Sequence, residues 1–450
     1  MGRSNTSRRG PLPAPTILAN DPTLTAFSGA IPLIRFLSQK LDIVRRLSTL
    51  FKDDGVRRIY SRHLILFSFM VGSVLGVHRL AHLEALRGDP VLLKFLRLPR
   101  WPVRKVFSNA LATLSDRGVD RLRDIIADVG LEPLKNQRSA VVDVDSSSIV
   151  SYGQQEGAVF GYSGKGRNRR RHHPLVASVA EIRTVIHADY RTGAAIKAVE
   201  AIAFIDRAVA VLRTKLSLGA QVIVRADSGF WSRAMGEHLL SVNLPFIFVI
   251  PMHAGVKLML RTSRWRCVDG DSDLQITSFG GERISLDGRL RIIGIRRRIR
   301  DAKAPPAGKE IAGCTKWRYQ ALVTSMAGVE EGLWRFYNDR ADCERIFKVA
   351  RGALGMGWLV GQKLRANETA FLLHLLAFNA DQRFQLFAEN QARESSHPTV
   401  SIGLIARQHR FYRTPGRLLK SQGRWRLRIG SGTRREHLWD FYAPELLGTG

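Results

Sequence analysis

Cysteine is scarce in this sequence of 450 residues, which contains three, at positions far apart. An odd number at wide spacing excludes a disulfide framework and a zinc-knuckle module, and it fits a reducing compartment. Long apolar runs are also missing. The most apolar stretch, residues 64–77, is shorter than the roughly 20 residues that a membrane-spanning helix needs, so it predicts a buried helix and no membrane partner. Residues 1–22 lack the apolar segment of a signal peptide and predict a disordered basic lead-in to a cytoplasmic protein.

Acidic residues are the second shortage. The chain has 39 Asp and Glu against 70 Lys and Arg, which gives a formal net charge of +31. A protein with this charge repels itself unless it meets a polyanion, so the composition predicts a nucleic acid partner. The alternative is a soluble protein that is merely basic. The hydrophobic content of 45% is ample for a large core.

Apolar residues recur with helical period over residues 23–135, which predicts a helical, DNA-binding domain. Within it, "RLPRWPVRKVFSNALATL" predicts a basic helix that starts at a proline after a short turn. This helix could read DNA as part of a helix-turn-helix. Ordinary packing in a helical bundle is the alternative.

The period changes at Ser139, where "SAVVDVDSSSIVSY" alternates as a β-strand does. The following segments predict three strands, helix, strand, helix and strand, a mixed α/β layout. Residues 138–254 are predicted as the first part of a core, 255–318 as a β-rich insertion and 319–392 as the second part. That second part includes "VEEGLWRFYNDRADCERIFKVAR" as one long helix. Residues 393–450 form a basic carboxy-terminal region in which aromatic and basic residues alternate.

Three carboxylate positions stand out by their context. Asp143 and Asp145 lie two apart on a strand and so share a face, and Asp227 lies where an apolar strand ends. The third is on a predicted helix, one face of which carries a carboxylate among cations: Tyr337, Arg340, Glu344, Lys348 and Arg351.

Acidic side chains in such a set could hold two hard cations about 4 Å apart for phosphodiester chemistry. Carboxylate oxygens favour Mg²⁺, for which Mn²⁺ is expected to substitute. The neighbouring cations would bind phosphates. The alternative is that the aspartates are turn or cap residues and that the helix face is merely solvated.

Three motifs together resemble the DDE-type insertion-sequence transposases of bacteria: "VDVDSSSIVSYGQQEGAVFGY", "VIVRADSGF" and "YNDRADCERIFKVAR". The resemblance is to the group with a Gln-Gln-Glu-Gly segment and a Tyr-x2-Arg-x3-Glu-x6-Lys signature. It implies a ribonuclease H-like mixed-sheet core, interrupted by a β-rich insertion before the glutamate helix and preceded by a helical domain.

The resemblance also implies roles for single residues. Asp145 is similar to the first catalytic aspartate, with Asp143 as the alternative metal ligand, while Asp227 and Glu344 are similar to the second and third acids. The residues that would bind DNA phosphates are Tyr337, Arg340, Lys348, and Arg351, which stands where the signature has lysine. The basic run at Arg169, Arg170 and Arg171 could also track phosphates, or it could be a solvated hairpin loop.

The predicted function is therefore binding of the terminal inverted repeats of a mobile element, followed by metal-dependent DNA cleavage and strand transfer. A homodimer is expected because two element ends must be joined. A metal-dependent nuclease without strand transfer and a catalytically silent DNA-binding protein are the alternatives. Two assignments stay open: Gln154, Gln155 and Glu156 could form a structural network or contact substrate, and Trp265 and Trp317 could stack on an unpaired base or pack internally.

Overall fold

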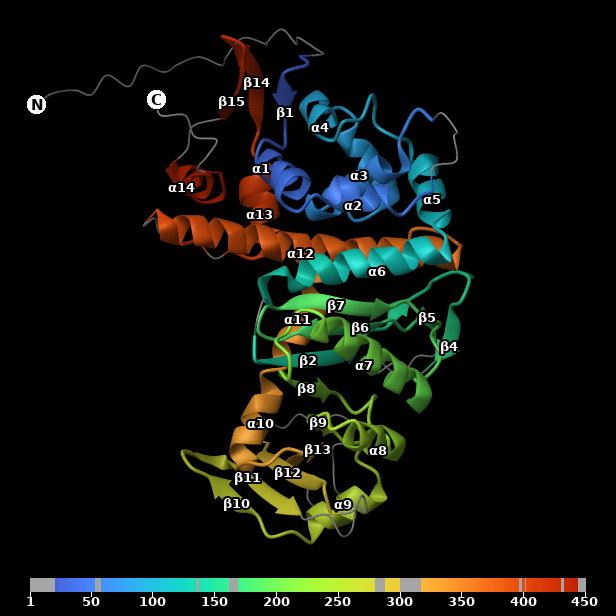
Figure 1. The fold of residues 1–450 in the computed structure, drawn as a ribbon, viewed down its shortest axis with the longest axis vertical. Helices are drawn as coiled ribbons and strands as arrows, with labels where there is room; N and C mark the ends of the chain where they lie inside the picture. Colours follow the sequence, from blue (N-terminus) through green and yellow to red (C-terminus); the bar gives the residue numbers. More distant parts are fainter. Residues whose placement is uncertain are drawn as a thin grey trace, which may run out of the picture.

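A nine-stranded mixed sheet runs through the molecule in the order β10-β11-β12-β13-β9-β8-β2-β6-β7 (Figure 1). Strands β2, β8 and β9 are parallel to one another, and the other neighbouring strands are antiparallel. The strands are β2 (Ser139–Ser146), β6 (Leu175–Val179), β7 (Thr184–Asp189), β8 (Gln221–Ala226), β9 (Phe246–Val249), β10 (Arg266–Val268), β11 (Asp271–Phe279), β12 (Arg291–Arg298) and β13 (Trp317–Thr324). The predicted α/β class with a mixed sheet is confirmed.

This computed structural model describes residues 21–52, 58–134, 137–161, 169–279, 288–299, 317–395, 399–400, 402–429 and 433–443, without the side chains of 341–344 and 433–436. The predicted lead-in therefore falls almost wholly outside the described residues, as does the cysteine at position 314.

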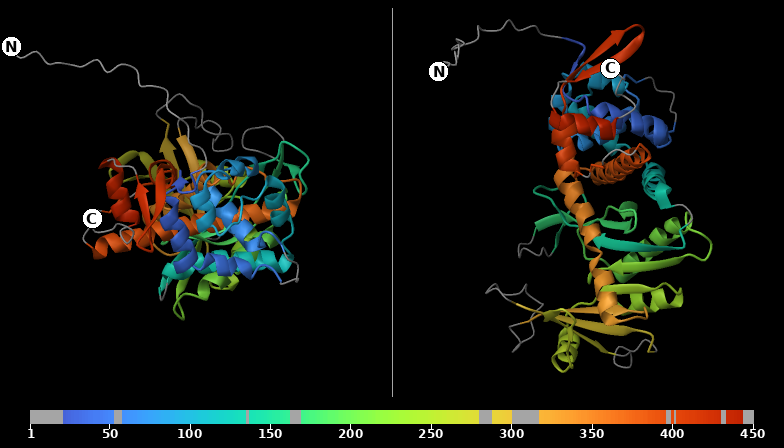
Figure 2. Two further views of the ribbon diagram at one scale, coloured as in Figure 1. Left: turned by 90° about the horizontal axis from the view of Figure 1, so that it is seen from above. Right: turned by 90° about the vertical axis from the view of Figure 1, so that its left-hand side faces the viewer.

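Alternate side chains of the central strands point to two different cores, as the pleat requires. Val142 and Val144 of β2 pack with helices α7 (Ala198–Arg213) and α8 (Arg233–Ser241) on one face. Asp143 and Asp145 therefore point to the other face, where the chain returns as helices α10 (Glu330–Asn338) and α11 (Ala341–Ala353). The right-hand view of Figure 2 shows α10 and α11 following each other along this side of the sheet.

Two long helices cover the edge strand β7. They are α6 (Asp116–Leu131), which starts at a Ser115 cap, and the 31-residue α12 (Leu364–Glu394). The buried amide of Asn379 on α12 accepts from Val185 N at 2.8 Å and donates to Val185 O at 2.7 Å and to Ile126 O at 3.0 Å. This pairing satisfies backbone groups of an edge strand that would otherwise be exposed.

The first and the last of the described elements pack together beyond α12 (Figure 1). Strand β1 (Leu24–Thr25) pairs with β14 (Gly416–Ser421), which forms a hairpin with β15 (Arg424–Ile429). The segments predicted as separate regions thus share one hydrophobic core. Besides α6, α11 and α12, the helices that contribute to this core are α1 (Ala30–Arg35), η1 (Phe36–Lys40), α2 (Ile43–Ser48), α3 (Arg62–Val74), η2 (Leu80–Leu86), α4 (Pro90–Phe95), α5 (Arg104–Ala112), α13 (Leu404–Arg407), η5 (Gln408–Tyr412) and α14 (Thr433–Tyr442).

The segment predicted as a β-rich insertion extends the main sheet. It contributes α9 (Ala254–Arg261) and strands β10 to β12, and β12 pairs along its whole length with β13. Arg296 of β12 lies between the rings of Trp265 and Trp317, at 4.5 Å and 4.4 Å from their centroids. Both tryptophans are therefore occupied by internal packing in this structure. Among the described helices, none combines the length and apolarity that crossing a membrane requires.

Candidate active site

The two predicted catalytic aspartates lie at matching positions on neighbouring strands. Strands β2 and β8 are parallel, and their register runs through Val144 opposite Ala226. Asp145 follows Val144 near the end of β2, and Asp227 follows Ala226 immediately after β8. Neighbouring strands are about 4.8 Å apart, and matched positions project to the same face. The fold therefore brings Asp145 and Asp227 together at the carboxyl ends of the parallel strands.

Hydrogen bonds hold both carboxylates in place. Asp145 Oδ1 accepts from its neighbour Ser146 N at 2.8 Å and lies 3.0 Å from Arg340 Nη2. The same Nη2 donates to the carbonyl of Val144 at 2.9 Å. Asp227 Oδ1 accepts from Gly229 N at 2.9 Å. One cation therefore already compensates part of the negative charge at the end of β2.

Asp143 has a different environment, although it shares a face with Asp145. Both of its oxygens accept hydrogen bonds from the Arg225 guanidinium, and both side chains are buried. A carboxylate used in this way is stabilised by its ion pair and is shielded from solvent. Sequence reasoning did not single out Arg225, although a charged residue inside the apolar run "VIVRA" was a signal that a buried partner had to exist.

The long helix predicted over residues 329–351 is interrupted. It consists of α10 and α11, separated by a turn at Asp339–Arg340. In that turn the Arg340 side chain is 5% exposed and reaches the end of β2. The prediction of one continuous helix was wrong because it ignored the gain from pairing Arg340 with the buried Asp145 carboxylate and the Val144 carbonyl.

Tyr337, at the end of α10, is buried close to both aspartates. Burial raises the pKa of the Tyr337 hydroxyl to about 12; the carboxylates of Asp227 and Asp145 favour the rise and Arg340 opposes it. The hydroxyl is therefore neutral at physiological pH and available as a hydrogen-bond donor. Tyr337 and Arg340 were both predicted to bind DNA phosphates; in the structure both side chains are buried, and Arg340 pairs with Asp145.

Helix α11 is tied to the end of β2 near both of its ends. Arg340 contacts Asp145 just before the helix, and Arg351 in its last turn donates to Ser147 Oγ and, at 2.6 Å, to the carbonyl of Ser148. Position 344 lies between these anchors on the same side of the helix, since positions four and seven apart share a face. Lys348 is exposed on this helix.

His173 is a further polar residue at this site that sequence reasoning did not place there. Its Nε2 lies 3.0 Å from Ser146 Oγ, beside Asp145. Burial lowers the pKa of the His173 imidazole; Arg191 and Arg171 act in the same direction, and Asp227 opposes them. A largely neutral imidazole can donate or accept a hydrogen bond here without adding charge.

The Gln-Gln-Glu segment forms a structural network with the start of α12. Glu156 N donates to the Gln362 carbonyl at 2.9 Å, and a carboxylate oxygen of Glu156 accepts from Leu364 N at 2.9 Å, which caps the helix. The Glu156 carbonyl lies 2.9 Å from Nε2 of the buried His172. Gln155 bonds to Ser151 Oγ. These contacts favour the structural reading of the segment.

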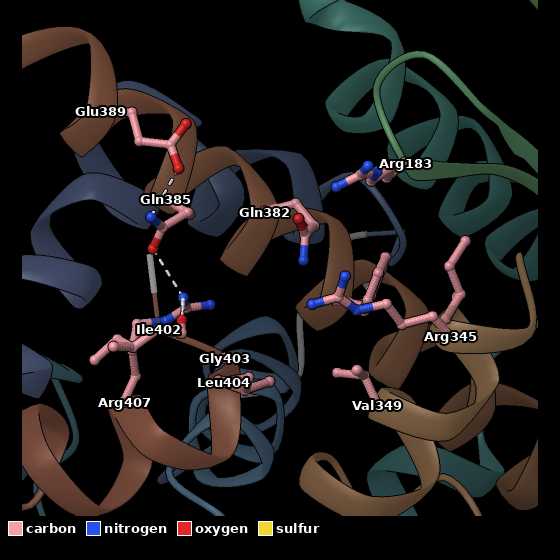
Figure 3. Close-up of a pocket in the computed structure, with 12 residues that line it drawn as sticks. Arg183, Arg345, Val349, Gln382, Gln385, Glu389, Ile402, Gly403, Leu404 and Arg407 are labelled. Atoms are coloured by element: carbon pink, nitrogen blue, oxygen red, sulfur yellow. Dashed lines mark hydrogen bonds between the residues drawn. The ribbon is translucent and has the colours of Figure 1, made fainter. Parts of the chain in front are cut away.

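A separate cavity of about 170 Å³ lies between α11, α12 and α13 (Figure 3). Arg345 and Val349 line it from the side of α11 opposite to Arg340 and Arg351, so it is not the site of the carboxylates. Its wall includes Arg407, which forms a buried ion pair with Asp381 and donates to Gln385 Oε1 at 2.8 Å.

The donor set at the ends of β2 and β8 fits a hard divalent cation. Two adjacent carboxylates supply oxygen ligands of the kind that such ions prefer, and a third would come from Glu344. Within the side chains that the structure describes, no group of three or more acidic, histidine or cysteine residues is poised around one point. The side chain of Glu344 lies outside that set.

Comparison with known proteins identifies the family. Residues 22–433 match the family model of transposase DDE domain group 1. No curated protein matches the chain. Among solved structures, the chain is similar to a piggyBac transposase, seen in the cryo-EM structure of a synaptic complex with hairpin DNA. The identity is 11% and the TM-score 0.46, over 87% of this chain and 81% of that one.

The chain belongs to transposase DDE domain group 1, because the match spans nearly its whole length. It is a transposase, an enzyme that binds DNA and catalyses its cleavage and strand transfer. The predicted family, enzyme class and DNA partner are confirmed. DDE transposases use divalent metal ions, with which the donor set described above agrees.

Proposed function

We propose that Asp145, Asp227 and Glu344 are the catalytic carboxylates of this transposase and that Mg²⁺ is their cofactor, with Mn²⁺ as a substitute. The observation that carries the proposal is the register of β2 and β8, which sets Asp145 beside Asp227. Asp145 is preferred to Asp143 as first ligand because both oxygens of Asp143 are used by Arg225 in the interior.

We infer that the core is ribonuclease H-like. The first three strands of the main sheet along the chain, β2, β6 and β7, are antiparallel neighbours. The next two, β8 and β9, lie on the other side of β2 and run parallel to it. Helices α7 and α8 provide the crossover connections, and the glutamate helix follows strand β13. Strands β10 to β12 then form the insertion that precedes this helix and widens the sheet.

Bound Mg²⁺ would polarise the scissile phosphodiester and assist ionisation of the attacking water. The chain's own residues have separate tasks. Arg340 holds Asp145 in one orientation and offsets part of its charge before DNA arrives. The Tyr337 hydroxyl, neutral at physiological pH, donates to a phosphate oxygen. Arg351 fixes the chain after Asp145, and exposed Lys348 binds a phosphate of the DNA end.

The substrate would be the terminal inverted repeats of the chain's own mobile element, read by the amino-terminal helices. Helix α5 presents Arg104 and Lys105 to solvent at its start, while Phe107 and Leu111 pack inside. Joining two ends to a target requires two active sites, so we propose a homodimer on DNA.

Labelled end DNA with Mg²⁺ tests the proposal. We expect end-specific nicks followed by strand-transfer products, and a loss of about 10³-fold or more in Asp145→Asn, Asp227→Asn and Glu344→Gln. Asp206→Asn, at an exposed aspartate that pairs with His238 on α8, is the matched control. Nicks without joined products would identify a nuclease. Undiminished activity of Asp227→Asn would refute the assignment.

A further inference from the structure

A small three-stranded sheet with exposed aromatic side chains stands beside the catalytic strand. Its strands are β3 (Ile149–Val150), β4 (Val159–Gly161) and β5 (Arg169–His172), in the order β3-β5-β4. Figure 1 shows β4 and β5 at the margin of the molecule. We call these strands and the connection between β3 and β4 the aromatic sheet.

Two aromatic side chains of the aromatic sheet are largely exposed to solvent. Tyr152, just after β3, is 85% exposed, and Phe160 on β4 is 62% exposed. Aromatic side chains are enriched at contact surfaces relative to the rest of a protein surface. A ring face that water covers in the free protein is available for stacking.

Each ring has an arginine beside it. The guanidinium of Arg169 lies 5.5 Å from the Tyr152 centroid, and that of Arg170 lies 5.2 Å from the Phe160 centroid. Arg169 and Arg170 are successive residues of β5, so their side chains project to opposite faces of the aromatic sheet. The sheet thus carries one aromatic–arginine pair on each face, with Arg171 as a third cation on the same strand.

No negative charge on residues 149–161 competes with these cations. Their one acidic residue, Glu156, is used in capping α12 through Leu364 N. The charge and the ring chemistry are therefore both those of a nucleic acid ligand.

The aromatic sheet is also fixed relative to the catalytic carboxylates. Strand β3 begins three residues after Ser146, and the intervening Ser147 and Ser148 are held by Arg351 of α11. The network of Glu156 secures its other end against the start of α12. A ligand bound to the rings would thus have a defined position relative to Asp145.

We propose that the aromatic sheet binds unpaired nucleotides of the DNA strands that leave the cleavage site. Bases stack on Tyr152 and Phe160, and the arginines of β5 pair with the flanking phosphates. Unpaired nucleotides are required because base faces inside a duplex are already covered by stacking, so an exposed ring has access only to a frayed or single-stranded base. The inference rests on the proposed function, in that it takes the chain to act on DNA ends.

Binding measured without metal ions tests this inference separately from catalysis. The probes are a short blunt DNA duplex and the same duplex with an unpaired extension of a few nucleotides containing a fluorescent purine. We expect full-length protein to prefer the extended duplex and to quench the probe. Tyr152→Leu and Phe160→Leu should each reduce the preference about tenfold, whereas Tyr152→Phe and Phe160→Tyr should retain it.

Trp358→Leu is the matched control, because this ring is 46% exposed and has the Arg79 guanidinium 3.8 Å from its centroid, yet it lies outside the aromatic sheet and should not affect the preference. Equal affinity of wild-type protein for both probes, or leucine variants that keep the preference, would overturn the inference. A change in the sedimentation of the leucine variants without DNA would overturn it too, since the rings would then serve a contact between copies. Metal-dependent nicking of blunt ends reports on the proposed function independently.

Discussion

Arg225 on β8 and Asp143 on β2 form a two-pronged ion pair inside the sheet. Arg225 Nε lies 2.6 Å from Asp143 Oδ1, and Nη2 lies 2.8 Å from Oδ2, with the residues 2% and 1% exposed. The third nitrogen, Nη1, donates to the carbonyl of Phe336 near the end of α10. One side chain thereby connects both aspartate-bearing strands to the helix that leads into α11. We infer that Arg225 positions the three catalytic elements.

Breaking this ion pair should cost stability. Asp143→Asn leaves the Arg225 charge buried without its partner, and we expect a loss of about 3–5 kcal/mol in the free energy of unfolding, measured with urea. The paired replacement of Asp143 by Leu and Arg225 by Met should recover much of it, because no buried charge remains. Asp206→Asn on the surface should change little. A fully stable but inactive Asp143→Asn would instead show that Asp143 is a metal ligand.

Acid should destabilise the protein through His374 on α12. Burial lowers the pKa of the His374 imidazole to about 3, with His78 adding to the shift. The unfolded chain takes up this proton near pH 6.5 and the folded protein does not, so stability is present above pH 6.5 and falls as the pH drops toward 3. The expected slope for one such group is about 1.4 kcal/mol per pH unit.

Replacing this histidine should flatten the pH dependence. The His374 ring packs on Phe69 at 5.3 Å, so His374→Phe keeps an aromatic ring in the same place. Urea unfolding at several pH values below 6.5 should show that the variant takes up about one proton fewer on unfolding than wild type. An unchanged slope would mean that His374 is protonated in the folded protein.

The β14–β15 hairpin carries a row of arginines that should bind DNA phosphates. Arg424, Arg426 and Arg428 alternate along β15 on one face, and Arg428 is directly opposite Arg417 on β14. Like charges placed opposite each other destabilise a sheet unless a polyanion neutralises them. Among the described acidic residues, Asp21 lies 2.9 Å from Arg417, the β14 residue opposite Arg428.

Changing the three arginines of β15 to Gln should weaken DNA binding and its salt dependence. Each lost phosphate contact removes about 0.9 from the slope of log affinity against log salt, so the slope should fall by up to about 2.7. Lys420→Gln on the other face of the hairpin is the control. Binding isotherms at several salt concentrations provide the measurement, and an unaltered slope would exclude the row from the DNA contact.

The sequence predicted those parts of the fold that depend on the pattern of neighbouring residues within one segment. The apolar strands around Asp145 and Asp227 and the amphipathic α7 follow from periodicity and from the position of each aspartate where a strand ends. The three motifs carried the family assignment, which the match over residues 22–433 confirms.

Other features depend on contacts between residues far apart in the chain, which periodicity does not contain. Asp143 and Asp145 look alike in sequence, and only the presence of Arg225 opposite one and Arg340 opposite the other distinguishes them. The break before α11 arises from the same Arg340 contact. The pairing of β1 with β14 likewise joins residues separated by most of the chain, so 23–135 and 393–450 read as separate regions.

Residues 145, 227 and 344 are proposed to meet around one metal site, and cleavage of the polypeptide by a bound metal tests this directly. Fe²⁺ bound in place of Mg²⁺ reduces added hydrogen peroxide to hydroxyl radicals, with ascorbate returning the iron to Fe²⁺; these radicals cut the polypeptide next to the metal, and mass spectrometry maps the cuts. We predict three clusters of cuts, around Asp145, Asp227 and Glu344, all lost in Asp227→Asn and suppressed by excess Mg²⁺. Cuts near one of these residues alone, or a pattern unchanged in Asp227→Asn, would show that the three carboxylates do not share a metal site.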